Sequence, residues 1–75
     1  MKVPTPLALP GDRVVVKNYR RKNMEERGSL ERIEYTMRGR ILGCWSYTIL
    51  LDRRSATDGP LRLFVGHESI VENLS

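Results

Sequence analysis

The sequence is poor in the residues that build disulfides and metal sites. Its 75 residues include one cysteine, Cys44, and one histidine, His67. A single thiol excludes an internal disulfide, and one cysteine with one histidine cannot supply the ligands of a structural zinc site. We therefore expect no metal and no cofactor, and interpret Cys44 as a small, half-buried apolar residue.

Long apolar runs are also missing. The N-terminal apolar stretch, residues 7–9, is enclosed by Pro6 and Pro10 and is far shorter than the roughly 20 apolar residues that cross a bilayer. It is also too short for the apolar region of a signal peptide. These absences predict a cytoplasmic protein with no membrane partner.

No constellation of catalytic residues can be recognised. Cys44 lacks a neighbouring base with a third group to orient it, and His67 stands alone beside Glu68 in a predicted tight turn. The glutamates of residues 25–34 alternate with arginines, which is typical of surface ion pairs. We expect a protein that is not an enzyme, with His67 in a hydrogen bond that stabilises its turn.

What the chain does contain is enough apolar sequence for one small domain. Apolar residues make up 40 % of the chain, which argues against disorder over most of its length. A domain of this size has a thin core. A thin core would gain from association with a partner or with further copies of the chain.

Alternating and β-branched apolar residues predict five short strands and no helix. The predicted strands cover residues 13–17, 30–37, 45–51, 61–65 and 70–74. In the first, Val14 and Val16 share one face and are expected to point inward. In the second, Leu30 is one residue out of phase with Ile33, which predicts a β-bulge near Glu31 and Arg32.

The third strand carries the largest side chains. Trp45, Tyr47, Ile49 and Leu51 alternate on one face, which we expect to pack into the core. A stacking platform made by Trp45 and Tyr47 is the alternative if that face is exposed. The stretch Arg40–Leu42 is predicted to be a short extended piece or a wide turn.

The segments between the strands are polar or rich in proline. Residues 1–10 contain three prolines and predict a flexible N-terminal arm before a domain of residues 11–75. Residues 18–27 are polar throughout and predict a long, exposed loop. Residues 53–60 are expected to connect the third strand to the fourth.

The net charge of +4 is unevenly distributed. Residues 13–40 hold nine basic and four acidic side chains, whereas residues 41–75 have a net charge of −1. Arginine and lysine can pair with phosphates, and tyrosine can stack on an unpaired base. The candidate nucleic-acid-binding residues are Lys17, Tyr19, Arg20, Arg21, Lys22 and Arg27.

Other interpretations of the same residues remain open. The basic segment can equally be a solvated loop whose charge keeps the chain soluble. Arg53 and Arg54 either extend a basic surface or solubilise a turn. Phe64 and Leu50 lie out of phase with the apolar faces of their strands and are candidate contacts for a partner or a second copy.

Two segments carry a resemblance to a known fold. Residues 11–16, Gly-Asp-Arg-Val-Val-Val, resemble the Gly-Asp-x-Val-x-Val opening of KOW and Tudor-type modules. Residues 28–33, Gly-Ser-Leu-Glu-Arg-Ile, resemble the Gly-x-Val-x-x-Ile second strand of that group. The resemblance covers residues 11–74 and implies an all-β, five-stranded SH3-like small barrel, here with a long basic loop after the first strand.

The chain departs from two members of this group. The glycine-rich link of KOW modules between the first two strands is replaced by residues 18–27. The Ala-Leu-Tyr-Asp-Tyr motif of signalling SH3 domains is missing, so binding of proline-rich peptides is not expected.

The Gly-Asp-Arg-Val opening also resembles plasmid-borne type II dihydrofolate reductases, which are SH3-like barrels that form a tetramer. Their Val-Gln-Ile-Tyr active-site strand corresponds to residues 61–64, which read Leu-Arg-Leu-Phe and lack both the glutamine and the tyrosine hydroxyl. The resemblance implies a barrel that can oligomerise rather than the reductase activity. Short barrels of this kind also resemble products of phages, plasmids and integron cassettes.

These observations support two hypotheses. The first is a non-enzymatic binding module that contacts nucleic acid through the basic loop. The alternative is a protein-interaction or self-assembling, homo-oligomeric module of a mobile-element or phage protein.

Overall fold

The computed structural model describes residues 5–38, 41–55, 57 and 59–75. The five strands are β1 (Arg13–Asn18), β2 (Met24–Arg38), β3 (Ile41–Ser55), β4 (Gly59–Gly66) and β5 (Ile70–Asn73). Two one-turn 3₁₀ helices, η1 (Tyr19–Arg21) and η2 (His67–Ser69), follow β1 and β4. The prediction of an all-β domain with five strands is confirmed.

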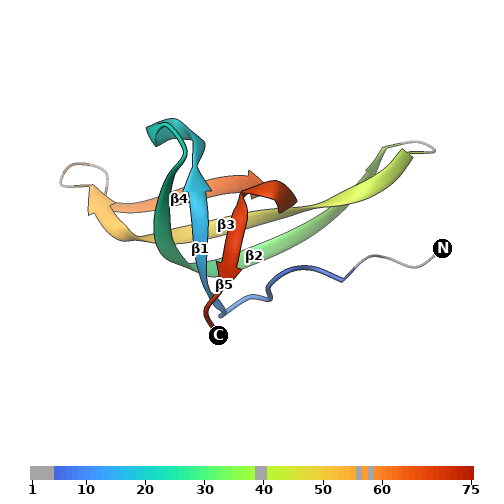
Figure 1. Ribbon diagram of the computed structural model, residues 1–75, viewed down its shortest axis with the longest axis horizontal. Coiled ribbons are helices and arrows are strands. Elements are labelled where there is room, and N and C mark those ends of the chain that lie inside the picture. Colours follow the sequence, from blue (N-terminus) through green and yellow to red (C-terminus); the bar gives the residue numbers. More distant parts are fainter. Residues whose placement is uncertain (1–4, 39–40, 56, 58) are drawn as a thin grey trace.

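The strands form one antiparallel sheet in the order β4-β3-β2-β1-β5. The first part of β2 pairs with β1, and from Gly28 onward β2 pairs with β3. Figure 1 shows β2 bending between these two partners, so that β1 and β5 run across the direction of β3 and β4. The sheet therefore folds over itself and encloses a core.

The sheet is open, because no strand pairing joins β4 to β5 within the residues described. The expected barrel is thus confirmed only as a five-stranded antiparallel sheet. The two edge strands, β4 and β5, are connected through η2. Among the described residues, the outer edge of each strand has no hydrogen-bonded neighbour in the sheet.

Gly28 lies at the bend of β2, between Val14 of β1 and Leu51 of β3. A Cβ atom at this position would lie 2.6 Å from the carbonyl oxygen of Leu50 and 2.7 Å from Cγ2 of Ile49. Only glycine permits this approach of the two strands. Two residues further on, the register shifts between Leu30 and Arg32, which confirms the predicted β-bulge.

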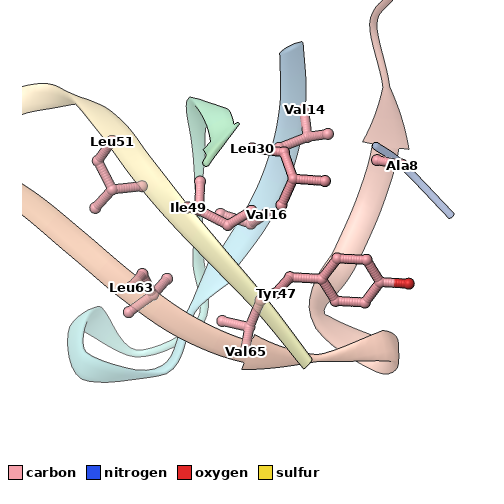
Figure 2. Packing of buried hydrophobic residues seen from close by; sticks show 9 residues of the cluster. All are labelled: Ala8, Val14, Val16, Leu30, Tyr47, Ile49, Leu51, Leu63 and Val65. Carbon is pink, nitrogen blue, oxygen red and sulfur yellow. The ribbon is translucent and has the colours of Figure 1, made fainter. Parts of the chain in front are cut away.

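The core lies between the two halves of the folded sheet (Figure 2). Its buried apolar side chains are Ala8, Val14, Val16, Leu30, Tyr47, Ile49, Leu51, Leu63 and Val65. The inward orientation predicted for Val14 and Val16 is confirmed. Trp45 is partly buried against the cluster, so the face that it shares with Tyr47 packs into the core and is not a stacking platform.

The N-terminal segment contributes to this core. Ala8 is 2 % exposed, and the backbone N–H of Leu7 donates a hydrogen bond to Tyr47 Oη at 3.0 Å. The Asn73 amide donates to the Leu7 carbonyl at 3.2 Å. The described part of the predicted arm, residues 5–10, therefore lies against the domain, and residues 1–4 are outside the described residues.

The prediction of a long, exposed loop over residues 18–27 is wrong. Met24 to Arg27 belong to β2, and the connection from β1 to β2 is only residues 19–23. Lys22 and Asn23 make the turn with positive φ angles of 54° and 60°. Polar composition suggested a loop, but pairing with β1 satisfies the backbone of this segment and leaves its charged side chains at the surface.

The connection predicted for residues 53–60 is also too long. Residues 53–55 continue β3, and β4 begins at Gly59. In the stretch 40–42, Ile41 and Leu42 belong to β3, whereas Arg40 lies outside the described residues. Cys44, expected to be half-buried, is exposed, because it is out of phase with the buried face of β3.

Candidate nucleic-acid interface

The turn after β1 is built around Asn18, a polar residue that is 3 % exposed. Its side-chain oxygen accepts a hydrogen bond from the Arg20 N–H at 2.9 Å, and its carbonyl accepts one from the Asn23 N–H at 2.9 Å. These bonds hold η1 in one tight turn. The side chains of Tyr19, Arg20 and Arg21 are therefore presented at the surface.

A second polar residue, Glu26, ties η1 to the end of β3. Its side chain is 10 % exposed, and its carboxylate accepts hydrogen bonds from Arg53 Nε at 2.7 Å and Arg21 Nη1 at 3.3 Å. The amide of Asn18 donates a further bond to the same carboxylate. Arg53 first, and then Asn18 and the charge of Arg21, lower the pKa of Glu26 although burial opposes the shift.

Four arginines line a shallow hollow of about 100 Å³. Arg20 and Arg21 come from η1, Arg53 from β3 and Arg62 from β4. The remaining lining residues are Asn18, Leu51, Leu61 and Leu63. We call this feature the arginine hollow.

The arginine hollow has an excess of positive charge. Glu26 binds Arg21 and Arg53, and Glu31 binds Arg62 at 2.8 Å, which raises the pKa of Arg62. Arg20 has no acidic partner among the described residues. The Arg62 side chain alternates with the buried Leu63 and lies with Glu31 on the other face, so that β4 residue borders the hollow without turning its charge into it. One carboxylate, Glu26, thus faces the three guanidinium groups of Arg20, Arg21 and Arg53, so the hollow retains a formal charge of about +2, which attracts an anion.

Tyr19 stands beside the arginine hollow. Its side chain is 52 % exposed, and the guanidinium carbon of Arg20 lies 5.7 Å from the centre of its ring, within the range of a cation–π interaction. The site therefore combines an exposed aromatic ring with a group of cations.

The structure brings together only some of the six residues predicted to bind nucleic acid. Arg20 and Arg21 line the hollow, and Tyr19 stands next to it. Lys22 is exposed in the turn but does not line the hollow. Lys17 and Arg27 project from the opposite face of the sheet, because the neighbouring positions Val16 and Asn18 are buried.

Arg62 is the lining residue that the sequence analysis did not consider, and Arg53 was considered only as a residue that either extends a basic surface or solubilises a turn. On β3, Arg53 lies two residues after the buried Leu51 and therefore on the same face. A predicted strand that ran to residue 55 would have placed Arg53 at the end of the inner face. Arg62 could not be found in this way, because its position depends on the pairing of β4 with β3.

The other face of the sheet carries a different set of groups. A hollow of about 300 Å³ is lined by Ser29, Leu50, Leu51, Asp52 and Arg54. Arg13 pairs with Asp52 through two hydrogen bonds, which lowers the pKa of Asp52. Arg54 lines the same hollow and the charge of Arg27 also lowers the pKa of Asp52, so this face carries positive charge as well. Phe64, 63 % exposed, pairs in register with Thr48 near this hollow.

The described part of the chain lacks two further kinds of feature. It contains no group of three histidine, cysteine or acidic residues that could hold a metal ion. It also contains no helix with the length and apolar character needed to span a membrane. Comparison of the chain with protein-family models, curated proteins and solved structures found no match.

Proposed function

We propose that the protein is a non-enzymatic binding module that contacts nucleic acid through the arginine hollow and Tyr19. The observation that carries this proposal is the convergence of Arg20 and Arg21 of η1 with Arg53 of β3 on one hollow, beside the carboxylate of Glu26. Residues distant in sequence are brought together there, which a solvated charged loop would not require.

The chemistry of arginine favours phosphate as the ligand. Its planar guanidinium group presents several N–H donors and forms bidentate, charge-assisted bonds with phosphate oxygens. Within the described residues Arg20 has no acidic partner to give up, and Arg21 and Arg53 are already oriented by Glu26. Nucleic acid is the common polyanion that also uses an exposed tyrosine.

The test is fluorescence anisotropy with labelled DNA and RNA over a series of salt concentrations. We expect affinity to fall steeply with salt, since each neutralised phosphate releases counterions. Arg20→Ala should weaken binding and lower the slope of log K against log salt by about one. Arg20 is the best target because it has no ion pair with any residue that the structure describes.

The matched control is Arg54→Ala, which removes the same charge from the opposite face of the sheet, where Arg54 lines the other hollow. We expect it to have a small effect. Equal losses in the two variants would show that net charge alone causes binding. Absence of salt-dependent binding to any nucleic acid would overturn the proposal.

A second candidate function is self-association, and Phe64 is the observation that favours it. This large apolar side chain is 63 % exposed on β4, an edge strand of the sheet. Exposed edge strands can pair with another chain. Light scattering over a concentration range tests the idea: wild type should associate and Phe64→Ser should not, whereas a wild type that is monomeric throughout rejects it.

We also propose that the fold belongs to the SH3-like class. Support comes from the strand order, in which β1 to β4 follow one another and β5 returns beside β1, and from the one-turn break η2 between the last two strands. An experimental structure superposed on KOW and Tudor-type domains would test this assignment.

A further inference from the structure

We infer that the nucleic acid bound at this site is single-stranded, with one backbone phosphate in the arginine hollow and a neighbouring unpaired base stacked on Tyr19. This inference rests on the proposed function and specifies its substrate class. It follows from the juxtaposition of an exposed aromatic ring with one compact group of cations.

The first argument is the closeness of the two binding elements. Tyr19 and Arg20 are consecutive residues of η1, and the Arg20 guanidinium carbon is 5.7 Å from the ring centre. A phosphate bound by Arg20 would therefore bring its own nucleoside within reach of the ring. In a duplex the base faces are covered by neighbouring base pairs, so only an unpaired base can stack on this side chain.

The second argument is the shape of the charged surface. The hollow is small, about 100 Å³, and its apolar lining consists of Leu51, Leu61 and Leu63. Such a hollow suits a single phosphate group. Duplex binding through the backbone uses several cations along the helix, whereas Lys17 and Arg27 lie on the other face of this sheet and cannot extend a row from the hollow.

The third argument is the exposure of Tyr19. Its backbone is already held by the hydrogen bonds around Asn18, and its side chain is 52 % exposed, so the ring adds little to the core. Its contact with Arg20 orients both side chains beside the hollow. A ring held in this way loses little conformational freedom when a base stacks on it.

The experiment compares four probes at one salt concentration and with equal numbers of phosphates. They are a single-stranded oligothymidylate, the same strand annealed to its complement, an abasic oligomer of the same backbone, and inorganic polyphosphate. Each is titrated against wild type, Tyr19→Phe, Tyr19→Leu and Arg20→Ala, and circular dichroism confirms that every variant remains folded.

We expect wild type to bind the single strand roughly five-fold or more tightly than the abasic oligomer, which is the gain typical of one stacked base. It should also prefer the single strand to the duplex. Tyr19→Leu should abolish both preferences and leave the affinity for polyphosphate unchanged, whereas Tyr19→Phe should retain both preferences. Arg20→Ala should lower the affinity for all four probes.

The outcomes separate this inference from the function on which it rests. Equal affinities for single strand, duplex and abasic oligomer, with the expected dependence on salt, would overturn the single-strand inference and leave nucleic-acid binding in place. Preferences that persist in Tyr19→Leu would also overturn it. Failure of wild type to bind any of the four probes would overturn the proposed function itself.

Discussion

The hydroxyl of Tyr47 lies 3.2 Å from Nδ1 of His67 and accepts a hydrogen bond from the Leu7 N–H at 3.0 Å. One buried side chain thus joins β3, η2 and the N-terminal segment. Figure 2 shows its hydroxyl pointing away from the centre of the core cluster. His67 therefore forms the hydrogen bond that the sequence predicted, and the partner is a tyrosine of the core.

Removal of this hydroxyl should destabilise the domain. We expect Tyr47→Phe to lower the free energy of unfolding by about 1 kcal/mol, because two partners lose a hydrogen bond while the ring still fills the core. For a domain of this size that corresponds to a fall of roughly 4–8 °C in Tm. Thermal unfolding followed by circular dichroism measures the change.

The control for this prediction is Tyr35→Phe. Tyr35 packs against Trp45 with 5.1 Å between ring centres, and its hydroxyl has no hydrogen bond within the described residues. The Tm of the Tyr35→Phe variant should stay close to that of wild type. Equal Tm values for Tyr47→Phe and wild type would show that the bonds of Tyr47 contribute nothing.

The bend of β2 should be sensitive to a single methyl group. We expect Gly28→Ala to cost about 1–3 kcal/mol, because the new Cβ would overlap the backbone of Leu50 and force β2 away from β3. Chemical denaturation gives the free energy of unfolding.

Gly66→Ala is the matched control, since its added Cβ would meet only the carboxylate end of Glu68 at 2.9 Å, and that side chain can move. We expect a much smaller loss for this variant. A Gly28→Ala protein as stable as wild type would contradict the close approach of the strands.

Stability should fall in acid because of Glu26. Its pKa is lowered in the folded protein from the ordinary value of 4.5, so the unfolded chain binds this proton more tightly than the folded one. The contribution of Glu26 is then complete above the unfolded pKa and is lost as pH falls through the lower, folded pKa. Urea unfolding between pH 7 and pH 3 should show this decline.

Glu26→Gln should lower stability at pH 7 and flatten the decline below pH 5. The exposed Glu25, which has no ion pair within the described residues, provides the control, and Glu25→Gln should leave the profile almost unchanged. Asp52 contributes a weaker decline of the same sign, because its pKa is also lowered but its pair with Arg13 is exposed. A Glu26→Gln profile identical to wild type would contradict the prediction.

Asn18 should affect both stability and binding. We expect Asn18→Ala to cost about 1–2 kcal/mol, because the Arg20 N–H loses its acceptor and Glu26 loses a donor. The altered turn should also weaken binding of nucleic acid by displacing Arg20. Urea unfolding and anisotropy measure the two effects, and unchanged binding in a destabilised variant would show that the turn does not position the site.

Much of the fold could be predicted from alternation alone. The period-two pattern placed Val14, Val16, Tyr47 and Ile49 on buried faces, and the phase error at Leu30 located the bulge. Strand ends were predicted less well. Charged residues such as Glu25 and Arg53 occur where composition favours a loop, and only pairing with a neighbouring strand makes them part of the sheet.

The candidate site was predicted in part. The sequence identified Tyr19, Arg20 and Arg21 as a local cluster, because these residues are consecutive. It also grouped Lys17 and Arg27 with them, although strand alternation sends these two to the other face. Arg62 joins the hollow only because β4 pairs with β3, a long-range contact that no local pattern records.

By itself, the amino-acid sequence determined an all-β domain, the inward face of its strands and the location of its bulge. Those properties follow from local alternation, in which every second side chain points to the same side. The tertiary structure alone decided the bend at Gly28, the docking of Ala8 and the placing of Arg53 beside the hollow that Arg20 and Arg21 line. These depend on pairing between segments far apart in the chain, where packing and backbone hydrogen bonds outweigh local preference.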